Sequence, residues 1–209
     1  MRAAGGVLLF ATLASTNTWA LSAATSVPMA PSASLHAVVG FPDAGLGFRI
    51  PFWQRRLNLI LGAGVRFPLA APTLDAGLGY QLRLPGPLRV DAAATGGVMA
   101  PLLPPTAVVT RAEVVTRGIL EFRYARFWTG PQLTAATGIT QTYRFDVGAA
   151  WTLGAQLRLW VLELGVVGAL GARAAHNRAP WSVAPQAVVP DGRLLFTAAW
   201  VVPEHPRPW

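Results

Sequence analysis

The chain has 209 residues, and 53% of them are hydrophobic while only 12% are charged, against roughly a quarter charged in soluble domains. It contains 17 arginines, no lysine and no cysteine, and its formal net charge is +8. The absence of cysteine excludes disulfides, thiolate metal sites and cysteine nucleophiles. The length suits one domain, and the low charge content predicts contact with lipid.

The arginines do not form a basic patch. They occur singly inside runs in which polar and apolar residues alternate, whereas a nucleic-acid-binding surface gathers basic residues beside exposed aromatic ones. We therefore expect no nucleic-acid partner. The preference for arginine over lysine, beside much alanine, glycine and proline, is equally well explained by a coding bias.

Residues 1–24 have the parts of a secretory signal peptide: one basic residue, an apolar segment, and small residues before a cleavage point after Ala20 or Ala24. An uncleaved membrane anchor is the alternative. It is less favoured because the apolar segment has only about a dozen residues, where a spanning helix needs about 20. Residues 25–33 are expected to form a flexible lead-in.

The following part of the chain consists of runs with a period of two, which is the repeat of a strand with one apolar and one polar face. The clearest run, 143–159, is longer than the roughly 3–10 residues of most soluble strands. Together the alternating runs cover 34–41, 45–53, 57–67, 74–84, 88–95, 110–124, 127–139, 143–159, 161–173 and 193–202.

Prolines and glycines separate these runs. Pro85-Gly86-Pro87 is typical of a tight turn, Pro131 weakens the run 127–139 because proline lacks a ladder donor, and 174–191 is either a broken strand or a long loop. Short connections are predicted near 54–56, 85–87, 125–126 and 190–192, and longer ones near 68–73, 99–108, 139–142 and 174–181. Residues 203–209 form a tail.

These observations predict an all-β fold, an antiparallel up-and-down transmembrane β-barrel of 8 to 10 strands over residues 34–202, with a polar, arginine-rich lumen. Ten strands are preferred if 174–191 is mostly loop. A helical inner-membrane protein is the alternative. Its best segments carry charges, as in 157–175, or several prolines, as in 92–110, so neither offers about 20 clean apolar residues.

The polar phase of the runs points into the predicted lumen and contains nine arginines and six carboxylates. An eight-stranded barrel has an interior that side chains just fill, so we interpret these residues as a charge-paired plug; the alternative is a path that favours anions. They are Arg66, Asp75, Arg83, Arg89, Asp91, Arg111, Glu113, Arg117, Glu121, Arg123, Arg144, Asp146, Arg158, Glu163 and Arg173.

A second group of residues, all aromatic, lies beside the predicted short turns. Such residues form girdles at the membrane interfaces of transmembrane barrels, whose short turns lie in the periplasm. The predicted girdle consists of Trp53, Tyr124, Phe127, Trp128 and Trp160.

The signal peptide, the alternation, the girdle and the turn lengths resemble the small bacterial outer-membrane β-barrels, the class that includes the OmpA and OmpX membrane domains. This resemblance covers about residues 34–202 and is one of architecture. It implies a place in the bacterial outer membrane after cleavage of the signal peptide, with membrane lipid and the barrel assembly machinery as partners. Barrels of this class often end on an aromatic strand residue recognised during assembly, here Trp200 or Trp209.

Catalytic chemistry has little support in the sequence. Lipid-modifying barrel enzymes of this size use a histidine with a serine and an acidic residue; His36 shares a strand face with Ser34, but no acidic partner is evident, and His176 and His205 fall in a loop and in the tail. No metal-ligand spacing or phosphate-binding loop occurs. We expect no catalytic residue, no metal and no cofactor. A structural or interaction barrel is the preferred function, and a small anion pore or a lipid-modifying enzyme the alternative; the loops identify no soluble partner.

Overall fold

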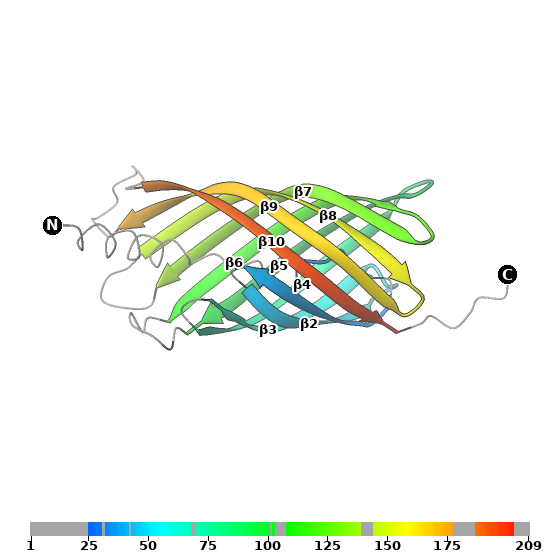
Figure 1. The fold of residues 1–209 in the computed structure, drawn as a ribbon, viewed down its shortest axis with the longest axis horizontal. Helices are drawn as coiled ribbons and strands as arrows, with labels where there is room; N and C mark the ends of the chain where they lie inside the picture. Colours follow the sequence, from blue (N-terminus) through cyan, green and yellow to red (C-terminus); the bar gives the residue numbers. More distant parts are fainter. Residues whose placement is uncertain are drawn as a thin grey trace.

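The computed structural model describes residues 25–30, 32–41, 43–67, 70–100, 102, 108–138, 144–177 and 187–202. Its strands are β1 (Ser34–Phe41), β2 (Asp43–Phe52), β3 (Leu57–Arg66), β4 (Ala71–Arg83), β5 (Leu88–Met99), β6 (Val109–Glu121), β7 (Ala125–Gly138), β8 (Arg144–Leu159), β9 (Leu162–Asn177) and β10 (Ala187–Val201). Each strand pairs antiparallel with its neighbours in sequence, and β1 closes the barrel on β10 (Figure 1). The predicted all-β barrel is confirmed, with ten strands.

The alternation of β8 decides which side chains enter the barrel. Thr152 and Gln156 are buried inside, whereas Trp151, Leu153 and Leu157 are exposed on the outer surface. The same alternation recurs around the barrel, because successive side chains of a strand point to opposite faces. The outer wall is therefore apolar and the inner wall polar.

The last two strands are longer than the sequence predicts. β9 continues to Asn177, and β10 begins at Ala187, so the short connection expected at 190–192 is wrong: Pro190 is paired with Ala172 inside the ladder. Pairing between β10 and β1 begins only at Leu194. Proline is tolerated at Pro190 because that part of β10 pairs with β9 alone, like an edge strand.

The prediction for the chain around β7 needs two smaller adjustments. The turn lies at 122–124 rather than 125–126, since β7 already begins at Ala125. The pairing of β7 with β6 is interrupted at Pro131, between the pairs Gln132–Val115 and Thr129–Gly118. The missing amide donor of proline accounts for this interruption.

The two ends of the barrel differ. The connections 53–56, 84–87, 122–124 and 160–161 lie at one end, which we call the turn end, together with the start of β1 and the end of β10 (Figure 1). Gly86 has a φ of 75° in its tight turn, a conformation that glycine adopts without steric cost. We call the opposite end the loop end.

The height of the wall also varies around the barrel. β1, β2 and β3 have 8 to 10 residues, whereas β8, β9 and β10 have 15 or 16. At about 3.3 Å per residue, the longer strands extend the wall further on their side of the barrel at the loop end.

The helical alternative is wrong, since its candidate range 157–175 forms the end of β8 and most of β9. Among the described residues, no helix is long and apolar enough to cross a membrane. The signal peptide, residues 1–24, and the tail, residues 203–209, lie outside the described part of the chain.

Candidate functional site: the barrel lumen

The lumen is lined by charged side chains that are almost fully buried. Charged groups are buried at a cost unless they are paired or hydrogen-bonded, so their partners determine what the lumen can do. The buried acidic residues are Asp43, Asp75, Asp91, Glu113, Asp146 and Glu163. The buried arginines are Arg49, Arg66, Arg89, Arg117, Arg126, Arg173 and Arg193.

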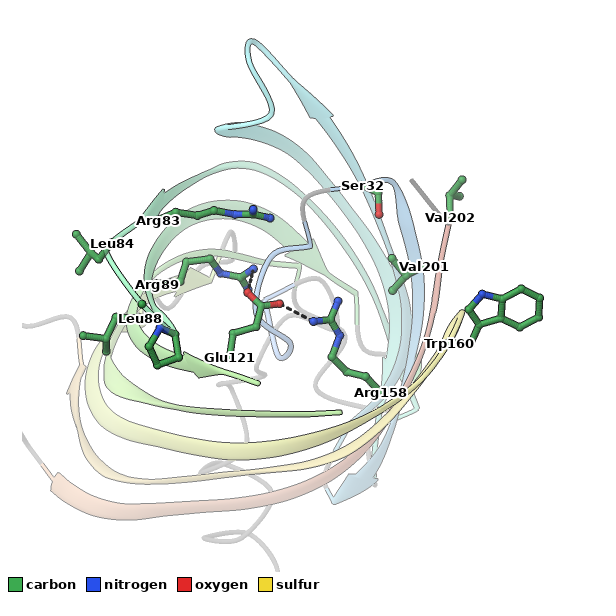
Figure 2. Close-up of a pocket in the computed structure, with 12 residues that line it drawn as sticks. Ser32, Arg83, Leu84, Leu88, Arg89, Glu121, Arg158, Trp160, Val201 and Val202 are labelled. Atoms are coloured by element: carbon green, nitrogen blue, oxygen red, sulfur yellow. Dashed lines mark hydrogen bonds and ion pairs between the residues drawn. The ribbon is translucent and has the colours of Figure 1, made fainter. Parts of the chain in front are cut away.

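At the turn end, one carboxylate holds three arginines. Glu121, at the end of β6, accepts hydrogen bonds from Arg158 at 2.8 Å, Arg89 at 3.0 Å and Arg126 at 3.1 Å. Glu163 of β9 accepts from two of these, Arg158 at 3.0 Å and Arg126 at 3.4 Å. Figure 2 shows Glu121 between Arg89 and Arg158 in the mouth of the barrel. This network joins β5, β6, β7, β8 and β9.

In the middle of the lumen lies the segment that the sequence assigns to a flexible lead-in. Residues 25–30, which we call the N-terminal segment, are buried against the inner wall. Arg49 donates hydrogen bonds to the carbonyl oxygens of Val27 and Pro28, and Arg117 donates to those of Thr25 and Val27. The wall therefore supplies hydrogen-bond donors for the backbone of these residues.

Further contacts fix the same segment on its other sides. Arg89 donates to the carbonyl oxygen of Met29 at 2.6 Å, and the backbone N–H of Met29 donates to Asp91 at 2.8 Å. The Thr25 hydroxyl donates to Glu113. The Met29 side chain belongs to a buried apolar cluster with Ile60, Ala93 and Val115 of the wall. Both backbone and side chains of the N-terminal segment thus take part in filling the lumen.

Further ion pairs lie toward the loop end. Arg111 of β6 donates two hydrogen bonds to the Asp75 carboxylate of β4, one of them at 2.8 Å. Arg193 donates to Asp191 at 2.6 Å, two residues away on β10. Arg66 and Asp43, paired across β2 and β3, have their closest charged atoms 4.0 Å apart.

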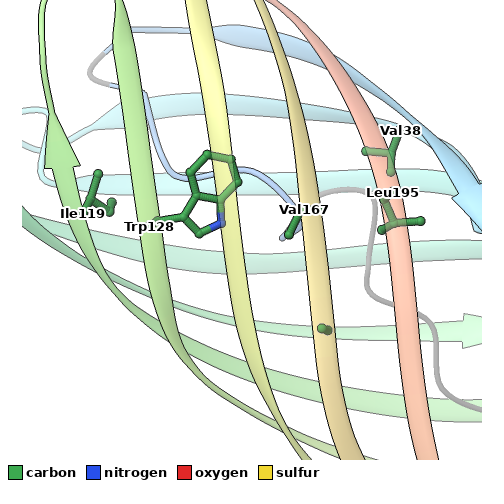
Figure 3. Packing of buried hydrophobic residues seen from close by; sticks show 6 residues of the cluster. Val38, Ile119, Trp128, Val167 and Leu195 are labelled. Atoms are coloured by element: carbon green, nitrogen blue, oxygen red, sulfur yellow. The ribbon is translucent and has the colours of Figure 1, made fainter.

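A cluster of apolar side chains lies along the inner wall of the barrel (Figure 3). It is formed by Val38, Ile119, Trp128, Val167 and Leu195, which come from five strands. Apolar contacts of this kind exclude water from the space between the strands. The inner wall therefore carries apolar packing as well as ion pairs.

Trp128 corrects the predicted girdle. Its side chain is only 3% exposed and lies inside the barrel, whereas its neighbour Phe127 is exposed outside. Adjacent residues of a strand face opposite ways, so Phe127 and Trp128 cannot both contact lipid. Room for the indole comes from Gly154 of β8, where a Cβ atom would overlap the ring.

The other predicted girdle residues, Trp53, Tyr124, Phe127 and Trp160, are all exposed and lie at or beside the turns of the turn end. Trp160 is the most exposed of them, at 93%. Phe127 also packs edge-on against Phe122, with ring centroids 6.3 Å apart. These residues occupy one end of the outer wall, where aromatic side chains favour a membrane interface.

Most of the predicted lumen residues are brought together inside the barrel, but two positions differ. Arg123 lies in the 122–124 turn, is exposed, and places its guanidinium 5.0 Å from the centre of the Tyr124 ring. It is outside the lumen because β6 ends at Glu121, before the alternation reaches it. Arg83 is at the turn-end mouth and is exposed. The side chain of Arg144 lies outside the described residues.

Five charged residues of the lumen were missed: Asp43, Arg49, Arg126, Asp191 and Arg193. The alternation of 43–52 contained the signal for the first two, since Arg49 shares a phase with Gly47 and Pro51. Arg126 was assigned to a turn, although it shares a phase with Trp128 and Gln132. Beginning the predicted run 127–139 at residue 125, where β7 begins, places Arg126 on the inner face.

The histidine and serine weighed for catalysis, His36 and Ser34, are both buried on the inner face of β1. The imidazole lies over Gly47, its cross-strand partner, where a Cβ atom would overlap the ring. Within the described residues, no group of three or more histidine or acidic side chains is arranged to hold a metal ion. The side chains of His176 and His205 lie outside the described part.

No protein-family model and no curated protein matches the chain. A solved structure of OmpT, an outer membrane protein of Vibrio cholerae folded in vitro, is similar to 83% of this chain, with a TM-score of 0.40 and 12% sequence identity. The match covers 62% of the length of that protein. The chain has the architecture of an outer-membrane β-barrel. Closure of the ladder, an apolar outer wall and a charged inner wall define that architecture.

Proposed function

We propose that this protein is an integral outer-membrane β-barrel of structural or interaction type, whose lumen is closed by its own N-terminal segment. One observation carries the proposal: Arg49, Arg89 and Arg117 all donate hydrogen bonds to backbone carbonyls of residues 25–30. Hydrogen bonds from charged donors contribute about 1.5–3 kcal/mol each. Several such bonds, together with the buried Met29, favour a segment that stays in place.

The orientation follows from the two ends. Short turns and aromatic residues favour the periplasmic interface for the turn end, and the loop end would face outward. The signal peptide would be removed on export, and the outer wall would contact membrane lipid. Trp200, exposed near the end of β10, supplies the aromatic residue that the barrel assembly machinery would recognise.

Single-channel recording in planar bilayers tests the closed lumen. The folded wild-type protein should give no stepwise current. A variant lacking residues 25–30 should conduct and favour anions, because Arg49, Arg89 and Arg117 would then line open space. Heat-modifiable migration on a gel confirms that each protein is folded. Equal currents from both proteins would contradict the proposal.

The second candidate function is a small anion-preferring pore. It is favoured by the excess of arginines over carboxylates at the turn end, where Arg89, Arg126 and Arg158 form ion pairs with Glu121 and Glu163 and Arg83 lines the mouth beside them. The same recordings test it, since a pore requires anion-selective current from the wild-type protein without removal of any segment.

A lipid-modifying activity has weaker support, and we propose that the protein is not an enzyme. The buried position of His36 and Ser34, inside the barrel and beneath Gly47, favours a role in packing. Mass analysis of lipid A from cells with and without the protein tests this. A mass difference that disappears in a His36→Ala variant would restore the enzymatic hypothesis.

A further inference from the structure

A cavity of about 450 Å³ opens at the turn end, inside the mouth of the barrel (Figure 2). Its volume falls within the roughly 300–1,000 Å³ of small-molecule sites. Arg83 of β4, Arg89 of β5 and Arg158 of β8 line it, with Glu121 between the last two and Ser32 on the side nearest β1. The N-terminal segment lies deeper in the lumen and leaves this cavity open.

Positive charge at the cavity exceeds negative charge. Arg83 and Arg89 are directly opposite each other in the β4–β5 register, and like charges at such positions destabilise a sheet. Arg89, Arg126 and Arg158 form their ion pairs with two carboxylates, Glu121 and Glu163. Among the residues that line the cavity, Arg83, Arg89 and Arg158 carry three positive charges and Glu121 one negative charge, which leaves an excess of two positive charges.

Some hydrogen-bond donors at the cavity already bind carboxylates, but others are available to a ligand. Arg158 binds Glu121 through Nη1 and Glu163 through Nε, so its Nη2 remains available, and its side chain is 28% exposed. Arg83 makes no hydrogen bond or ion pair with any described residue, and Figure 2 shows its guanidinium directed into the mouth. The Ser32 hydroxyl lies on a third side of the same cavity.

We infer that this mouth is a binding site for a phosphate monoester. Such a group carries about −1.5 to −2 charges at pH 7, which matches the two unbalanced positive charges. Its three terminal oxygens can accept from donors on different sides, here Arg83, Arg158 and Ser32. Arginine forks suit phosphate geometry, and the cavity is large enough to hold an organic substituent. The ester is either a soluble molecule or the headgroup of a lipid at the periplasmic interface.

Calorimetric titration of the folded full chain tests this site at pH 7.5 and constant ionic strength in chloride. Glycerol phosphate is the soluble probe, added to protein in uncharged detergent. Phosphatidic acid is the lipid probe, compared with phosphatidylcholine in nanodiscs. Arg83→Gln should weaken binding about tenfold, because it removes a charge-assisted hydrogen-bond donor. Since Arg83 is exposed and has no partner among described residues, this variant should keep its heat-modifiable migration.

Arg123→Gln is the matched control, because it removes the same charge from the same end of the barrel but outside the cavity. Binding of glycerol phosphate that is weakened about tenfold in Arg83→Gln and unchanged in Arg123→Gln supports a soluble ester. The same pattern with phosphatidic acid alone supports a lipid headgroup. Absence of binding to both probes, or equal losses in the two variants, overturns the inference.

Discussion

The backbone N–H of Met29 donates a 2.8 Å hydrogen bond to the carboxylate of Asp91, 62 residues further along the chain. The same carboxylate lies 3.7 Å from the Arg117 guanidinium, which itself holds Thr25 and Val27. Asp91 therefore joins the N-terminal segment to the wall of the barrel. Loss of this carboxylate removes an acceptor for the segment and a counter-ion for a buried arginine at once.

Asp91→Ala should lower the free energy of unfolding by about 3–5 kcal/mol, the usual cost of breaking one side of a buried ion pair. Asp191→Ala is the comparison: its partner Arg193 is buried, but the Asp191 side chain is partly exposed, so water reaches this pair and its loss should cost less than that of Asp91. Urea midpoints of the folded proteins measure both. Similar midpoints for the two variants would show that Asp91 does not anchor the segment.

Leu153→Arg should cost about 2–4 kcal/mol, because it places a charge on the outer wall near the middle of the membrane. Leu153 is 54% exposed and lies six residues before the end of β8. Leu159→Arg, at the turn end of the same strand, should cost about 0–1 kcal/mol. Unfolding in lipid vesicles compares them, and equal costs would mean that the membrane boundary is placed wrongly.

Gly154→Ala should destabilise the barrel by about 1–3 kcal/mol, because the added methyl group overlaps the Trp128 indole and overpacking has costs of that size. Gly138→Ala should be nearly neutral, since nothing lies within 4 Å of the added atom. The smaller side chain of Trp128→Leu should relieve the cost of Gly154→Ala. A cost that persists in the double variant would place its cause in the backbone of β8.

The sequence was sufficient for the barrel and for the direction of most side chains. In β8, for example, the alternation alone places Leu153 outside and Asp146 inside, as the structure does. The predicted strand ends were less accurate than the predicted faces. Proline is typical of a strand end, and Pro190 is tolerated inside β10 because that part of the strand has a single neighbour. That condition depends on the lengths of β1 and β10 together, and these are set by the register.

The position of residues 25–30 inside the barrel could not be predicted. Their composition, rich in small residues with one proline and one methionine, is that of a linker. Their burial results from donors supplied by three distant strands, through Arg49, Arg89 and Arg117. The individual ion pairs could not be predicted from the sequence either. Arg126 and Arg158 meet Glu121 only because of the register between β6, β7 and β8.

Removal of Glu121 distinguishes a closed lumen, in which Glu121 and its arginines stabilise the barrel, from an open pore, in which they line the channel. In a closed lumen, Glu121→Ala leaves Arg89 without its carboxylate, and Arg126 and Arg158 with Glu163 alone. The variant should lose about 1.5–3 kcal/mol of stability, the range for hydrogen bonds to charged groups, while conductance stays absent because the N-terminal segment is untouched. Glu121→Gln, which keeps an acceptor, should lose less. Unchanged urea midpoints together with the appearance of anion current would instead identify Glu121 as part of the lining of an open pore, since removing an anion from a hydrated channel favours anion passage.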